Sequence, residues 1–284
     1  NLNVVIQTSY STQDAVFFHT MDYQRIKIIP HGEHVLEVTL NRPKKINAMD
    51  PQLWQEVGHF FTEAKNLRKC RCILLSGQGR HFSAGIDLKN SGLDGNASNP
   101  ETKNDESGTD PDPATVAFGI LRLGTLWQNA HSAIAECGRP VIAVIQGACI
   151  GAALEMISAS DIRLCSSNAY FAAPEVDLGI AADVGGNQRF PKLIGNDSLL
   201  RELMFTGRRM DATEAYGLGF VSHVYESHDS LRQAALDMAQ LIASKSPVAV
   251  TRGLQHDHRS HFGLCCKSAC DNIQLGLKPR AQSG

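Results

Sequence analysis

The chain has 284 residues, of which 43% are hydrophobic and 20% are charged. These proportions are typical of a folded globular protein and exclude collagen-like, disulfide-scaffold and wholly disordered chains. Lys and Arg number 27 against 29 Asp and Glu, so the net charge of −2 provides no field that would attract nucleic acid or an anionic membrane. We therefore expect no nucleic-acid partner, and a non-catalytic module for binding RNA is disfavoured on the same ground.

The first part of the chain alternates predicted strands with helices. Residues 1–22 show no clear period and are interpreted as an N-terminal arm. Two strand-like runs within 23–40 indicate a β-hairpin. Asp50 followed by proline predicts the start of an amphipathic helix over 51–67, and a short buried strand follows at 71–77. This order indicates the beginning of a layered α/β fold.

An acidic segment separates this part from the rest of the chain. Residues 90–113 contain six acidic side chains and one lysine, a composition that favours a flexible surface loop. Beyond it, the apolar period predicts a helix over 114–136. The long apolar stretch 141–157 is interrupted by polar residues and glycines, which indicates a buried strand, a turn and a helix rather than a membrane span.

The eight cysteines bear on redox state and on metal binding. Adjacent pairs such as Cys265 and Cys266 suit structural disulfides poorly, so we expect mostly free thiols in a reducing compartment. His261 and Cys265 have a helical spacing that could hold a metal ion, but it matches no zinc template. No metal site is therefore predicted.

Two turns of small residues are candidates for a ligand site. In the segment 147–155 a predicted strand runs through a small-residue turn into a helix, where a ligand could approach free backbone amides. A second small-residue turn, 81–88, follows the preceding strand. Amides from the two turns could converge on one oxygen, as acyl chemistry requires. Alternatively, the small residues only allow close packing, and Asp87 caps the turn that follows it.

Three carboxylates fall within one short region of the sequence. Glu155, Glu175 and Asp183 have mainly apolar neighbours. Carboxylates in apolar surroundings have raised pKa values and become usable acids and bases near neutral pH. The alternative is a structural role in ion pairs with Arg163 or Arg189.

Taken together and in order, five segments of the chain resemble the enoyl-CoA hydratase/isomerase, or crotonase, family. They read NRPKKINAMD, HFSAGIDL, GACIGAALEMISASDIRL, APEVDLGIAADVGGNQRFP and LMFTGRRMDATEAYGLGFVSHVY. The resemblance implies an α/β fold, a crotonase-like spiral of ββα units over 23–197 with a mainly helical trimerisation region at 198–284. It further implies an acyl-CoA thioester substrate, no separate cofactor or metal, a homotrimer or homohexamer, and a mitochondrial or peroxisomal location.

The same resemblance implies roles for individual residues. The oxyanion-hole amides fall on Ile86 and Ala152. The residues that would bind the substrate or its CoA part are Lys45, Ala84, Gly85, Ile86, Asp87, Leu88 and Ala153.

For catalysis, the resemblance favours one branch of the family. The pattern EVDLGIAADVG is similar to that of members that isomerise 3,5-dienoyl-CoA to 2,4-dienoyl-CoA in fatty-acid β-oxidation. Glu175 would then remove a proton from C2, Asp183 would return one at C6, and Glu155 would orient or polarise the substrate. Those isomerases have aspartate at the position of Glu155, so 2-enoyl-CoA hydration by Glu155 and Glu175 remains the alternative.

Overall fold

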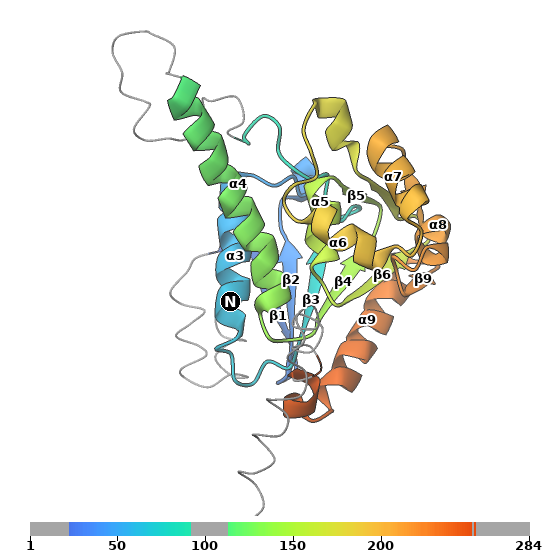
Figure 1. The fold of residues 1–284 in the computed structure, drawn as a ribbon. Helices are drawn as coiled ribbons and strands as arrows, with labels where there is room; N and C mark the ends of the chain where they lie inside the picture. The colour runs from blue at the N-terminus through green and yellow to red at the C-terminus, as the bar shows by residue number, and fades with distance from the viewer. Residues whose placement is uncertain (1–22, 92–112, 252, 254–284) are drawn as a thin grey trace, which may run out of the picture.

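The computed structural model describes residues 23–91, 113–251 and 253 (Figure 1). The predicted N-terminal arm, most of the predicted loop 90–113 and the end of the C-terminal region lie outside these residues, so those predictions stay untested. Pro113, the last residue of the predicted loop, is instead the first residue of a helix.

A six-stranded sheet forms the centre of the fold, in the order β1-β2-β3-β4-β6-β9. Its strands are β1 (Ile26–His31), β2 (Val35–Leu40), β3 (Cys72–Gly77), β4 (Val141–Ile145), β6 (Ile162–Ser166) and β9 (His223–Tyr225). Only β1 and β2 pair antiparallel, as the predicted hairpin requires. The other neighbours pair parallel. Strands β2, β3 and β4 are buried along their whole length, as their apolar sequences require.

A second, smaller sheet has three short strands, β5 (Ala148–Ile150), β7 (Tyr170–Ala172) and β8 (Met210–Asp211). Strand β5 pairs parallel with β7, and β7 pairs antiparallel with β8. The residues predicted as a turn before the helix are therefore largely a strand.

Helices cover both faces of the large sheet (Figure 1). They are α3 (Pro51–Ala64), α4 (Pro113–Glu136), α5 (Ala152–Ser158), α6 (Gly186–Leu193), α7 (Asp197–Thr206), α8 (Ala212–Gly217) and α9 (His228–Ala243), with short 3-10 helices η1 (Pro43–Lys45) and η2 (Pro174–Leu178). Helices α3, α4 and α5 pack on one face, and α9 packs on the other. The Asp50 side chain caps α3 by accepting the Leu53 N–H at 2.9 Å, as predicted.

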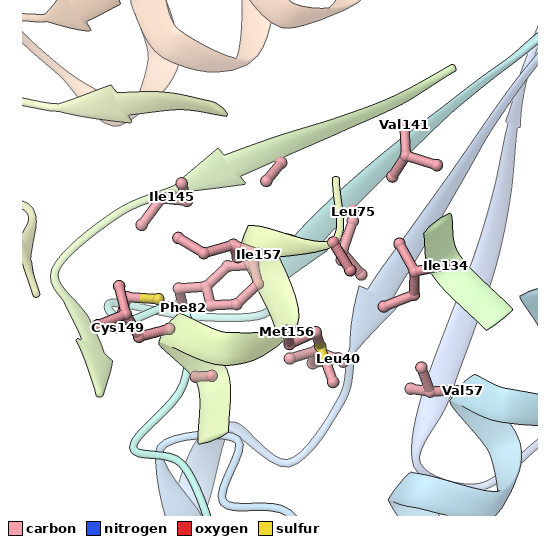
Figure 2. Close-up of a cluster of buried hydrophobic side chains, with 14 of the residues drawn as sticks. Leu40, Val57, Leu75, Phe82, Ile134, Val141, Ile145, Cys149, Met156 and Ile157 are labelled. Atoms are coloured by element: carbon pink, nitrogen blue, oxygen red, sulfur yellow. The ribbon is translucent and has the colours of Figure 1, made fainter. Parts of the chain in front are cut away.

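The larger core lies between the sheet and α3, α4 and α5. Figure 2 shows Leu75 of β3 near Met156 and Ile157 of α5, with Val57 and Ile134 from the two long helices close by. Leu74, the residue before Leu75 in β3, packs against α9 on the opposite face of the sheet. This alternation follows from the two-residue period of a strand.

Three further expectations can be checked on the described part of the chain. No helix there is long and apolar enough to cross a bilayer. Its cysteines are Cys70, Cys72, Cys137, Cys149 and Cys165, and all are free and buried. No cluster of metal-ligating side chains occurs among these residues. The C-terminal histidines and cysteines considered above lie outside them.

Candidate active site

The two small-residue turns meet at the carboxyl ends of neighbouring strands. The turn 81–88 follows β3, while the segment that enters α5 follows β4. Ser83 N–H donates to Ala148 O at 3.0 Å, and Ile150 N–H donates to Ser83 O at 3.2 Å. Gly85 has φ +83°, and a Cβ there would lie 2.4 Å from Ile150 O, so only glycine fits this approach. The two turns are therefore in direct contact, and the convergence of their amides on one substrate oxygen stays a prediction.

Each turn carries a backbone N–H for which the described residues provide no acceptor. Around Ile86, Met49 N–H donates to Gly85 O at 2.8 Å and Asp87 N–H donates to Met49 O at 3.0 Å. This pattern does not use the Ile86 N–H. Ala152 is the first residue of α5, so its N–H has no acceptor within the helix. The two turns lie side by side, because a Cβ on Gly85 would be 3.4 Å from Ala152 N.

Glu155 is a buried carboxyl group on α5. Its Oε2 accepts the Gly186 N–H, the first of α6, at 2.6 Å. A Cβ on Gly186 would lie 2.8 Å from that oxygen, so the absence of a side chain there makes the contact possible. Burial, together with the negative charges of Glu175 and Asp183, raises the pKa of Glu155 from 4.5 to about 8. Glu155 therefore holds its proton for most of the time at pH 7.

Glu175 lies in η2, the 3-10 helix that follows β7. Pro174 precedes it and fits the first position of a helical turn. The side chain is buried, and its Oε2 has no hydrogen-bond partner among the described residues. Its Oε1 lies 3.1 Å from the Cβ position of Gly151, directly before the free amide of Ala152. Burial and the charge of Asp183 raise the pKa of Glu175.

Asp183 is not enclosed by apolar neighbours, and the prediction that it would be is wrong. Ala182 and Val184 are buried while Asp183 between them is exposed, because successive side chains here point alternately inward and outward. Its side chain borders an open groove of about 830 Å³ between α4, α5 and α6. Asp183 is thus accessible from solvent, whereas Glu155 and Glu175 are not.

The expected alternative of structural ion pairs is not observed. Within the described ranges, no Lys or Arg pairs with Glu155, Glu175 or Asp183. Arg163 instead donates to Phe220 O at 2.6 Å and to Ser160 O at 2.7 Å. The charge of the three carboxylates is therefore left uncompensated by any direct contact with a cation in this part of the chain.

The predicted substrate-binding residues differ in what they offer a ligand. Lys45 is exposed and adjoins the turn 81–88, because Ala84 N–H donates to Ile46 O at 2.9 Å. Leu88 is 55% exposed, whereas Ala153 is fully buried and presents no side-chain surface. The predicted contacts to CoA remain predictions.

The carboxylate of Asp87 is already used within the protein. Both terminal nitrogens of Arg42 lie 3.0 Å from its Oδ2, and Asn90 donates to the same oxygen at 3.1 Å. Burial opposes ionisation, but these bonds prevail and lower the pKa of Asp87. This bonding agrees with the alternative structural role, and Arg42 was not singled out from the sequence.

Two further residues missed by sequence reasoning hold the segment that carries Asp183. His131 on α4 is fully buried, and its Nδ1 lies 2.8 Å from Val184 O. Because a carbonyl only accepts, Nδ1 carries the hydrogen, and burial lowers the pKa of His131 to about 3, so the ring is neutral. Gln128, one helical turn earlier, donates to Asp183 O at 3.1 Å. The only available signal was two polar side chains three residues apart on one helix face.

Comparison with known proteins decides the family. The model of the enoyl-CoA hydratase/isomerase family matches residues 35–261. The chain belongs to the enoyl-CoA hydratase/isomerase family. A solved enoyl-CoA hydratase from Bacillus anthracis superposes with a TM-score of 0.72 at 26% identity, covering 89% of this chain and 88% of that one. A putative enoyl-CoA hydratase from Rhodopseudomonas palustris gives 0.68 at 32% identity, covering 82% and 81%. The predicted family and its crotonase-like α/β fold are confirmed.

Among enoyl-CoA hydratase/isomerase relatives, several carry a more specific name. The human protein named Delta(3,5)-Delta(2,4)-dienoyl-CoA isomerase, mitochondrial, is 42% identical over 80% of this chain. The chain spans 66% of that relative's length. An Arabidopsis thaliana protein with the same name, but designated peroxisomal, is 36% identical over 81% of this chain and 80% of its own length.

Proposed function

We propose that this protein isomerises 3,5-dienoyl-CoA thioesters to 2,4-dienoyl-CoA. The observation that carries the proposal is the trio of carboxylates without cationic partners, Glu155, Glu175 and Asp183, beside two free backbone amides. Two of the three are buried, and the third borders an open groove. The names of relatives that are 35% to 42% identical support the same reaction.

The thioester oxygen would be held by the N–H groups of Ile86 and Ala152. Negative charge develops on this oxygen when a proton leaves C2, and a fixed donor in such a site contributes about 3 kcal/mol to the transition state. Lys45 and the backbone of 84–88 would hold the CoA part. Ala153 would contribute only to the backbone of the helix start.

Two carboxylates would then move the protons. Glu175, beside the Ala152 turn, removes a proton from C2, and the electron pair of that bond enters the conjugated system as a dienolate. As the dienolate collapses, Asp183 donates a proton to C6, leaving double bonds at C2 and C4. One proton leaves the substrate and one enters it, so no oxidant or reductant is needed.

Glu155 would act as a neutral neighbour of this pair. With its proton retained, it adds no full negative charge next to Glu175 and can donate a hydrogen bond. We propose an orienting role for it, as well as a reaction that requires neither metal nor separate cofactor. The relatives' names suggest a mitochondrial or peroxisomal location, which is part of the proposal. A trimeric or hexameric assembly, as the family resemblance implies, completes it.

Hydration of 2-enoyl-CoA is the second candidate. The observation that favours it is the pair of buried glutamates, Glu155 and Glu175: burial raises the pKa of both, and the charge of Glu175 adds to the rise for Glu155. Such a pair could activate water across the C2=C3 bond. Asp183 would have no part in that reaction.

The test compares the two substrates on one preparation. The purified protein should convert a 3,5-dienoyl-CoA into the conjugated 2,4-product, followed by its absorbance, faster than it adds water to crotonyl-CoA. Fast hydration without isomerisation would favour the second candidate and overturn the first.

A further inference from the structure

A second polar pocket lies at the other end of the central strands. The candidate active site follows the carboxyl ends of β3 and β4, whereas this pocket is lined by residues just before them, Arg71 and Arg139. Arg68 and Lys245 complete its charged lining, and Lys245 follows the end of α9. Its volume is about 80 Å³. This pocket is therefore separate from the candidate active site.

The lining of this pocket, which we call the cationic pocket, has four positive side chains and no carboxylate. Among the described residues, Glu33 is close enough for its charge to interact with that of Arg71, but its carboxylate pairs with Lys69 at 2.9 Å. No Asp or Glu of this part of the chain forms an ion pair with Arg68, Arg71, Arg139 or Lys245. Gathering like charges costs free energy unless an anion neutralises them. The chain as a whole is slightly acidic, so this grouping is not a result of overall composition.

Two of the three guanidinium groups in the cationic pocket are held in place. Arg71 Nη1 donates to Ala243 O, at the end of α9, at 3.0 Å. Arg139 Nη2 donates to Lys65 O at 3.2 Å and to Leu67 O at 3.1 Å, just beyond α3. The Nε of Arg139 is buried and has no acceptor among the described residues. A buried donor without an acceptor is costly and uncommon in folded proteins, which points to a missing acceptor here.

We propose that the cationic pocket binds a phosphate-type oxyanion. Arginine forks match the oxygens of phosphate, and fixed guanidinium groups lose little freedom when they bind it. The small size of the pocket and its cationic lining suit a compact anion such as a single phosphate group. Arg68 and Lys245, both exposed, close around the group from the solvent side.

Calorimetric titration with inorganic phosphate at constant ionic strength tests the proposal. The wild type should bind phosphate saturably. Arg68→Gln with Lys245→Gln should weaken this binding by about tenfold or more, because two charge-assisted contacts are lost. Lys27→Gln with Arg122→Gln is the matched control, since it removes the same charge from exposed positions outside the pocket. The control should bind within about twofold of the wild type.

Glycerol phosphate serves as a second ligand and distinguishes free phosphate from the phosphate of a larger molecule. The proposal is supported if the wild type and the control variant bind either ligand and the pocket variant does not. Lack of saturable binding in the wild type, or equal weakening in both double variants, would overturn it. Phosphate that competes with acyl-CoA in wild type and pocket variant alike would also overturn it, because the anion would then occupy the active site.

Discussion

Two buried glutamates of this protein have opposite surroundings. Glu37, on β2 facing α9, accepts hydrogen bonds from His31 at 2.8 Å, from Ser76 at 2.7 Å, and from both terminal nitrogens of Arg232 at 2.9 and 2.8 Å. Burial alone would raise the pKa of Glu37, but these bonds lower it to about 2. Glu155 is equally buried but accepts one backbone N–H and has no cation in contact, and its pKa is about 8.

The difference shows how one residue type serves structure in one place and chemistry in another. A fully bonded carboxylate such as Glu37 is fixed in its charged form and joins α9 to the sheet. Glu155 and Glu175 have no cation in contact among the described residues, and burial raises the pKa of both, as is common for acids and bases in functional sites. A buried carboxylate without hydrogen-bond partners lowers the stability of the folded protein. Such a group is therefore expected mainly where function requires it.

The largest effect should come from removing the proton acceptor at Glu175. Glu175→Gln should lower isomerisation by about 10² to 10⁴. Its melting temperature should stay the same or rise, because a neutral amide replaces a poorly bonded buried carboxyl group. Asp177→Asn, an exposed position in the same 3-10 helix, is the control and should keep its activity. Equal loss in both variants would contradict the assignment.

Breaking the ion pair between Glu37 and Arg232 should lower stability and leave activity unchanged, the opposite of the result expected for Glu175→Gln. Arg232→Met leaves the buried Glu37 charge without its guanidinium and should lower the free energy of unfolding by about 2 kcal/mol, less than for a fully buried pair because Arg232 is 39% exposed. Activity per folded molecule should not change. Gln240→Met, exposed on the same helix, should alter neither quantity. Denaturant unfolding with activity assays checks both, and loss of activity without loss of stability would refute the structural role of this pair.

Gly186→Ala should disturb the single hydrogen bond that Glu155 accepts. The new Cβ would lie 2.8 Å from Glu155 Oε2 and 2.7 Å from a ring carbon of Phe190, closer than side chains tolerate. We expect a loss of about 1 to 3 kcal/mol in stability, with reduced activity. Gly195→Ala, where nothing lies within 4 Å, should be neutral by the same unfolding measurement. A fully stable and active Gly186→Ala protein would show that this contact is unimportant.

Stability should also depend on pH through Glu155. The pKa of Glu155 is raised in the folded protein from 4.5 to about 8, so between these values the folded state keeps a proton that the unfolded chain has lost. The free energy of unfolding therefore falls as pH rises across this interval, by at most about 1.4 kcal/mol per pH unit. Glu155→Gln should remove this contribution, as urea unfolding at about pH 5.5 and about pH 7.5 would detect. An unchanged slope would mean that Glu155 is ionised in the folded state.

Much of the fold was predictable because local patterns determine it. The cap before α3, the apolar strands and the small-residue turns follow from residues adjacent in sequence. The strand at 148–150 was missed because its pairing partner, β7, is about one helix and one strand away along the chain.

The site was predicted less completely, since its electrostatics depend on distant segments. Asp183 has apolar neighbours in sequence but an exposed side chain in the fold. The partners of Asp87 and Val184 are Arg42 and His131, separated from them by 45 and 53 positions. No pattern within a short window identifies such partners, so the sequence could single out the three carboxylates as candidates but not tell which of them the fold would bury.

The central claim is that separate carboxylates handle the protons at C2 and C6, and Asp183→Asn in D₂O tests it most directly. Glu175 is intact in this variant, so the C2 hydrogens of a 3,5-dienoyl-CoA should exchange with solvent at close to the wild-type rate. Formation of the 2,4-dienoyl product should fall by about 10² to 10⁴, because no acid remains to deliver a proton to C6. Wild-type isomerisation by a folded Asp183→Asn protein, or equal loss of exchange and isomerisation, would contradict the account.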